Sequence, residues 1–196
     1  MVDEYTLLEE AKKFQNYGAS GVSLYDSAGS YLPQDVQKKI TYLAEHLEID
    51  VGFHAHNNLG MAIANSIAAV NAGAQIIDGA IMGFGAGAGN AQLEVLVAVF
   101  EKLEIKTGID LYKILDCASL ASQSFVKLPP TITPISIVSG LAGVFSGFSK
   151  HVERAAKEYG VDARDIFFEL GKRNVVGGQE DLILEVASNL HKTNLR

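Results

Sequence analysis

Apolar residues in the first hundred positions recur with two spacings, one typical of helices and one typical of strands. Between residues 4 and 16 they recur every three or four positions, which predicts a helix that ends near Gly18. Strand–helix units follow at intervals of about 25 to 30 residues, as expected for βα repeats in a parallel sheet. The predicted strands are 21–25, 51–56 and 75–82, and the predicted helices are 33–47, 60–71 and 92–103.

The chain changes character after Gly108, where no further strand pattern occurs. Prolines at 129, 130 and 134 indicate a loop, and glycines within 139–159 allow close packing or a kink of the helix predicted there. Gly171 is expected to end another helix. We therefore expect an α/β unit at 1–107 and a small all-α domain at 108–196, with helices at 110–124, 139–159, 162–172 and 179–190.

Composition narrows the class of protein. Hydrophobic residues make up 48% and charged residues 20% of the 196 residues, which is enough for a sizeable buried core. The net charge of -7 and the lack of a basic cluster argue against nucleic-acid binding. Cys117 is the only cysteine, which excludes a disulfide framework and suits a reducing compartment. Without a signal peptide or an apolar run long enough to span a membrane, we expect a cytoplasmic protein.

The ends of the predicted strands carry the candidate chemistry. Right-handed crossovers place all strand ends at one rim of the sheet, which is where α/β proteins bind and react. Asp26 and Ser27, His54 and His56, and the glycine-rich segment 83–90 are expected to converge at this rim.

His54 and His56 alternate along a predicted strand, so both imidazoles lie on one face and form a candidate pair of metal ligands. The alternative is one hydrogen-bonded core histidine and one loop histidine. A carboxylate is the natural third ligand, from Asp26 or Asp78. Asp26 is equally suited to capping the following turn. Asp78 lies within a strand, which favours an internal hydrogen-bonding role.

Three further features of the rim have more than one interpretation. Ser27 is placed to hydrogen-bond a substrate oxygen, or is a turn serine. Asn90 is a metal ligand, a partner of one, or, as we favour, the cap of the next helix. Residues 83–88 match a dinucleotide-binding pattern weakly, and a glycine-rich anion site is the more general reading.

Together, the motifs resemble those of the 4-hydroxy-2-oxovalerate aldolases, which are pyruvate aldolases. The motifs are 25–29, 52–60, Asp78 with 83–90, and 176–181, the last being similar to the helical communication region of these aldolases. Their superfamily of metal-dependent TIM barrels includes hydroxymethylglutaryl-CoA lyase and isopropylmalate synthase. The resemblance implies a partial TIM barrel, the last three βα units, at 1–107 and a helical communication domain at 108–196.

The same resemblance implies a reaction and its participants. His54 and His56 would be ligands of a divalent ion, typically Mn²⁺, that stabilises the pyruvate enolate. Ser27 would hydrogen-bond the substrate carboxylate. The reaction would cleave 4-hydroxy-2-oxopentanoate, a 2-keto acid, to pyruvate and acetaldehyde, and the usual partner is an acylating acetaldehyde dehydrogenase.

Two departures from the family pattern limit this reading. The resemblance begins at the helix before the sixth barrel strand, so the family's Arg-Asp motif and a catalytic histidine have no counterpart in these 196 residues. In the family, that motif supplies the aspartate metal ligand and the arginine that stabilises the enolate. The family's catalytic tyrosine matches Phe145, which has no hydroxyl for proton transfer. The catalytic residues of the chain are therefore not assigned.

Three strands cannot close a barrel, so we expect a fragment, or a chain that associates with itself or with a missing N-terminal half. The leading hypothesis is a partial metal-dependent aldolase, which segment 176–181 favours. The alternatives are a related Claisen-type condensing enzyme and a non-catalytic assembly or partner-binding module, which Phe145 favours.

Overall fold

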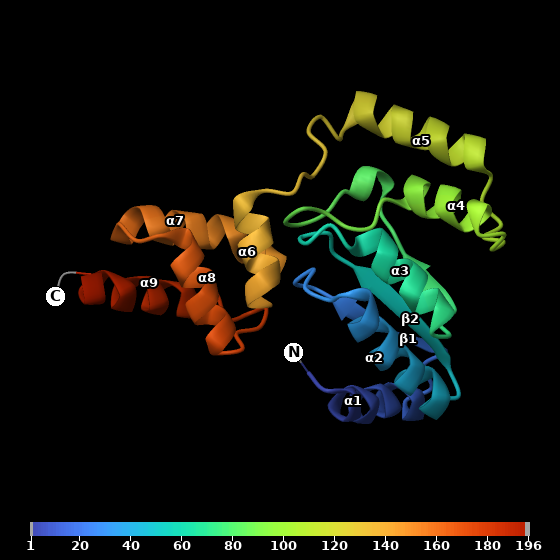
Figure 1. The fold of residues 1–196 in the computed structure, drawn as a ribbon, viewed down its shortest axis with the longest axis horizontal. Coiled ribbons are helices and arrows are strands. Elements are labelled where there is room, and N and C mark those ends of the chain that lie inside the picture. The colour runs from blue at the N-terminus through green and yellow to red at the C-terminus, as the bar shows by residue number, and fades with distance from the viewer. Residues whose placement is uncertain (1, 195–196) are drawn as a thin grey trace.

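The computed structural model describes residues 2–194, and within them one parallel sheet forms with the strand order β1-β2-β3 (Figure 1). The strands are β1 (Gly21–Asp26), β2 (Asp50–Ala55) and β3 (Ile76–Asp78). This confirms the predicted α/β class and the position of each strand. The third strand is much shorter than predicted, because the chain turns at Ile81–Gly83 with Met82 in the left-handed region at φ 54°.

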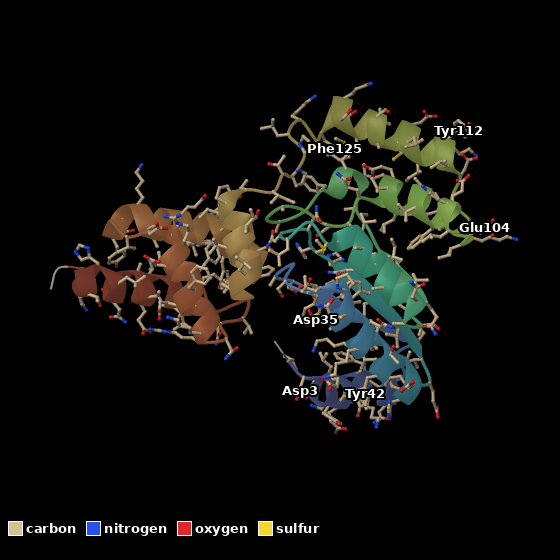
Figure 2. The ribbon with its side chains drawn as sticks, viewed as in Figure 1. Asp3, Asp35, Tyr42, Glu104, Tyr112 and Phe125 are labelled. Carbon is tan, nitrogen blue, oxygen red and sulfur yellow. The ribbon has the colours of Figure 1, made fainter. Side chains whose placement is uncertain are left out.

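Helices follow or precede the strands much as the apolar spacing predicts. They are α1 (Glu4–Asn16), α2 (Pro33–His46), α3 (Ala62–Asn71) and α4 (Leu93–Lys102). Pro33 opens α2, and Asp35, which is labelled in Figure 2, accepts a hydrogen bond from the Leu32 amide at 2.9 Å. In Figure 1, α2 and α3 lie on the same side of the sheet, and both contact β2.

The two faces of the sheet differ in chemistry because side chains alternate along each strand. One face is apolar and packs against the helices, with Leu24, Val51 and Phe53 almost fully buried. The other carries a row across the three strands, formed by Tyr25, His54 and Asp78 at paired register positions. Tyr25 is 55% exposed. The sheet is thus covered on one side, and its polar row lies on the other.

The rest of the chain is helical, as predicted. The helices are α5 (Leu111–Ser124), α6 (Pro134–Ala142), α7 (Ser149–Tyr159), α8 (Ala163–Lys172) and α9 (Asp181–Asn194). Helix α5 contacts α4, whereas α6 to α9 share a second hydrophobic core built around Phe148, Phe167 and Leu170. We call α6 to α9 the helical unit; Figure 1 shows it beside the sheet-containing unit. The proposed domain division after residue 107 stays a prediction.

Two local predictions in the helical unit are wrong. The single helix predicted at 139–159 is divided, because Gly143 ends α6 with φ 66° and the short helix η2 (Ser146–Phe148) follows. Gly171 does not end a helix but lies within α8, where a Cβ atom would overlap the carbonyl oxygen of Ala142. It is needed for the close approach of α6 and α8. In the described part of the chain, no helix is long and apolar enough to cross a membrane.

Candidate metal and substrate site

The predicted rim forms at the ends of the three strands. Asp26 pairs with Ala55, and His54 pairs with Asp78, so the strands end at nearly the same level. The glycine-rich segment 83–90 folds back onto the end of β2, where the Asn57 amide donates to the Gly89 carbonyl at 2.8 Å. Segments that follow three different strands therefore meet at one place.

The two histidines lie side by side at this rim. Their ring centroids are 5.3 Å apart, with the ring planes at 61°. The His54 ring also stacks on Tyr25, with centroids 4.6 Å apart and planes at 20°. This is the proximity that the alternation along β2 predicts, and it leaves both imidazoles at the strand end.

Asp78 lies beside His54, with its Oδ2 atom 3.5 Å from Nδ1 of the imidazole. A proton on Nδ1 would face this carboxylate, and it would leave Nε2 free to bind a metal. Asp78 is thus positioned as a partner of His54 on the polar face of the sheet.

His56 has an unsatisfied nitrogen. Burial lowers the pKa of His56, and the neighbouring His54 lowers it further, while the Ala86 backbone opposes the shift. The imidazole is therefore held neutral, the form that binds metals. Its Nδ1 atom is buried, and within residues 2–194 it has no hydrogen-bond partner.

Asn90 lies opposite His56 in an isolated antiparallel bridge, which places both side chains on the same side. The Asn90 Oδ1 atom is also buried without a partner in the described chain, while its Nδ2 donates to the Phe84 carbonyl at 3.2 Å. The prediction that Asn90 caps the next helix is wrong, since Gln92 is the N-cap of α4. An unpaired nitrogen and an unpaired oxygen on bridged residues are the ligands that a cation would satisfy.

Asp26 does not join this group. It is only 2% exposed and lies on the covered face of the sheet, where it accepts hydrogen bonds from the Ser30 amide at 2.9 Å and the Tyr31 amide at 3.0 Å. Burial raises the pKa of Asp26, against the effect of these bonds. Of the two roles predicted for this residue, the structure thus supports the turn cap.

Among the His, Cys, Asp and Glu side chains of the described residues, no group of three could hold a metal ion. The chain therefore offers two imidazoles and, from Asn90, one amide oxygen. The loop amides are less available for an anion: those of Ala88, Gly89 and Asn90 all donate hydrogen bonds within the protein.

Ser27 and Phe145 lie where the second core meets the rim. Ser27 is exposed, and its carbonyl accepts hydrogen bonds from the amide and hydroxyl of Ser146 at 3.3 and 3.2 Å. The Phe145 ring packs edge-on against Phe148, with centroids 5.7 Å apart, at the border of the second core. The roles of His54, His56 and Ser27 remain predictions.

Sequence reasoning missed the role of Asn58. The side chain of the preceding Asn57 accepts a hydrogen bond from the Ala62 amide at 3.2 Å, at the start of α3. Asn58 is instead fully buried and bonds to Ala28, Ala88 and Ser146. The only sign of this role in the sequence is that Asn58 directly follows another asparagine, Asn57, at the end of the predicted strand.

Comparisons with known proteins identify the family of this chain. The HMGL-like family model matches residues 1–121, and a DmpG-like communication domain matches residues 130–192. The chain is 61% identical over 194 residues to a 4-hydroxy-2-oxovalerate aldolase from Pectobacterium atrosepticum, covering 99% of this chain and 57% of that protein. It is 62% identical over 190 residues to the aldolase of the same name from Spirochaeta aurantia, covering 97% and 56%. The chain thus spans little more than half the length of these relatives.

Solved structures show the same fold. Rhizobium etli pyruvate carboxylase matches 100% of this chain and 21% of its own, with a TM-score of 0.79 and 19% identity. The N-terminal domain of a putative aldolase from Bacteroides vulgatus matches 73% of this chain and 47% of its own, with a TM-score of 0.65 and 25% identity. The three-stranded parallel sheet with its helices is accordingly a partial TIM barrel. The chain belongs to the HMGL-like family.

Proposed function

We propose that the chain is part of a metal-dependent aldolase that cleaves 4-hydroxy-2-oxopentanoate to pyruvate and acetaldehyde. The observation that carries the proposal is the group of His54, His56 and Asn90 at the strand ends, with unsatisfied buried atoms on two of the three. The 61% identity to an aldolase of Pectobacterium atrosepticum supports the choice of reaction.

The residues present fit part of a divalent-ion site. His54, His56 and Asn90 would hold the ion with two nitrogens and one oxygen, a mixed set that divalent transition metals accept, and the family resemblance favours Mn²⁺ among them. When bound, such an ion supplies Lewis-acid stabilisation of the enolate that forms from the keto acid. The family's aspartate ligand has no counterpart in these residues, so we expect the chain alone to bind the ion weakly.

The side chains of this chain would prepare the site for the substrate. Asp78 favours the proton on His54 Nδ1, and the burial of His56 keeps its imidazole neutral. The exposed Ser27 hydroxyl would donate a hydrogen bond to the substrate carboxylate. Phe145 cannot take the proton that leaves the 4-hydroxyl group, so another group must do so.

We further propose an acylating acetaldehyde dehydrogenase as the partner of the whole protein. The match of residues 130–192 to a DmpG-like communication domain supports this. The outer edges of β1 and β3 have no neighbouring strand within the described chain. We therefore propose that a complementary barrel half, or a second copy, covers these edges.

The proposed aldolase activity can be tested with the whole protein, these 196 residues together with the complementary barrel half proposed above, in the presence of Mn²⁺ and 4-hydroxy-2-oxopentanoate. Pyruvate is measured by coupling to lactate dehydrogenase, and His151→Ala on α7 is the control for His54→Ala because His151 is exposed and far along the chain. We expect metal-dependent pyruvate release that His54→Ala abolishes and His151→Ala preserves.

Two results would favour the other candidates. A folded protein that binds Mn²⁺ but releases no pyruvate supports the non-catalytic module, which the absence of a hydroxyl at Phe145 favours. Release of free thiol from acetyl-CoA in the presence of a 2-keto acid would instead indicate a Claisen-type condensing enzyme.

A further inference from the structure

The side-chain amide of Asn58 connects three segments at the border between the rim and the helical unit. Its Nδ2 donates to the Ala28 carbonyl at 2.9 Å and to the Ser146 hydroxyl at 2.7 Å. Its Oδ1 accepts from the Ala88 amide at 2.9 Å. Asn58 is completely buried, so these bonds take the place of water.

Ser146 completes the connection from the other side. It is 1% exposed, and its amide and hydroxyl both donate to the carbonyl of Ser27. Because the hydroxyl proton goes to Ser27, the hydroxyl oxygen is free to accept from Asn58. The Ser146 carbonyl in turn accepts from the Ser149 hydroxyl at 3.0 Å, at the start of α7.

Packing around this pair leaves little room for independent movement. A Cβ atom on Gly87 would lie 2.6 Å from Asn58 Oδ1 and 2.9 Å from Ser146 Cβ. A Cβ atom on Gly29 would lie 2.8 Å from the backbone nitrogen of Asn58, and one on Gly140 would lie 3.2 Å from Asn58 Cβ. Glycines from two rim loops and from α6 thus let their backbones approach Asn58 closely, and a shift of one segment moves the others.

We propose that Asn58 and Ser146 form a latch through which the helical unit fixes the conformation of the rim loops 26–31 and 83–90. Both are positioning residues: Ser146 holds the backbone of Ser27, and Asn58 holds the segment that leads to Asn90. A ligand or partner that displaces Ser146 would release both loops together. The importance of the latch for catalysis rests on the proposed function, whereas the coupling itself does not.

Amide hydrogen exchange by NMR tests the latch without metal or substrate. Ser146→Ala leaves one buried N–H of Asn58 unpaired, which should raise the exchange rate of the Ala88 amide about tenfold or more. The matched control is Ser66→Ala, because Ser66 is also fully buried but bonds only to the Ala62 carbonyl within α3. We expect the Ala88 rate in this control to stay within about twofold of the wild type.

The proposal is overturned if Ala88 exchanges at the wild-type rate in Ser146→Ala, or if the control raises it equally. If Ser146→Ala does not fold, exchange of the wild-type chain in increasing denaturant replaces it. The Ala88 and Ser146 amides should then open in one event with the same denaturant dependence. Separate openings would refute the latch. A latch that passes these tests in a protein without aldolase activity would count against the proposed function alone.

Discussion

Gly87→Ala is the substitution that most directly probes the packing of the rim against the helical unit. Gly87 has φ +62°, a conformation that costs a residue with a side chain about 1–2 kcal/mol. The new methyl group would also lie 2.6 Å from Asn58 Oδ1 and 2.9 Å from Ser146 Cβ, well inside van der Waals contact. Relieving such overpacking costs about 1–3 kcal/mol. We expect a total loss of about 3 kcal/mol in the free energy of unfolding.

Gly108→Ala separates the two contributions. Gly108 has φ +74°, and a Cβ atom there would have nothing within 4 Å, so only the backbone strain of about 1–2 kcal/mol applies. Urea unfolding followed by circular dichroism gives both free energies by linear extrapolation. Gly87→Ala should lose about 2 kcal/mol more than Gly108→Ala. Equal losses would show that the helical unit does not pack against the loop as described, and would refute the reasoning.

Three further changes have defined outcomes. Asp162→Ala should lower the free energy of unfolding by about 1 kcal/mol, because Asp162 caps α8. Hydrogen bonds from Arg164 lower the pKa of Asp162 from its ordinary value of 3.8 to about 2, so this stabilisation is complete above pH 3.8 and is lost as the pH falls towards 2. The difference in melting temperature between the wild type and Asp162→Ala should therefore disappear as the pH falls from 3.8 towards 2. A difference that stays constant over this range would contradict the role of Asp162 as a charged cap. Burial, with smaller effects of Asp26 and Asp35, raises the pKa of Tyr31 to about 12. Absorbance after rapid pH jumps should therefore show a phenol that ionises near pH 12 in the wild type and is missing in Tyr31→Phe. Identical titrations of the two proteins would disprove this assignment. Asp78→Asn should reduce the Nδ1-protonated tautomer of His54, measured by ¹⁵N chemical shifts, whereas an unchanged tautomer would exclude Asp78 as its partner.

Strong periodic patterns accounted for most of the fold. The helix from Glu4 to Asn16 follows from apolar residues at every third or fourth position, and the strand at 50–55 follows from alternation; the structure confirms both elements. The third strand was overextended because Ile81 and Met82 continue an apolar run. There the tertiary structure prevails: the chain turns with Met82 in the left-handed region, and Asn90 is brought opposite His56.

Glycine was the residue whose role the sequence left most ambiguous. Gly143 and Gly171 both lie in apolar helical patterns, yet the first ends α6 and the second permits α6 and α8 to approach closely. Backbone conformation separates the first case, since Gly143 has a positive φ. The role of Gly171 depends on the position of the neighbouring helix α6, which no local sequence pattern indicates.

The candidate site shows the same limit. Alternation along β2 was sufficient to predict that His54 and His56 lie together, because both belong to one short segment. The Asn58–Ser146 hydrogen bond was beyond prediction, because it joins residues 88 positions apart in two different hydrophobic units. Polar groups that connect distant segments depend on the final packing, which has no periodic signal in the sequence.

A Mn²⁺ titration of the protein, followed by NMR of its histidine rings, tests the proposed metal site most directly. The chain has five histidines, and His46, His151 and His191 serve as internal controls. The ring signals of His54 and His56 should broaden at Mn²⁺ concentrations that leave the other three sharp, and Asn90→Ala should shift that broadening to higher concentration. If all five broaden together, or if His54 and His56 remain sharp, the rim of the sheet does not bind the metal.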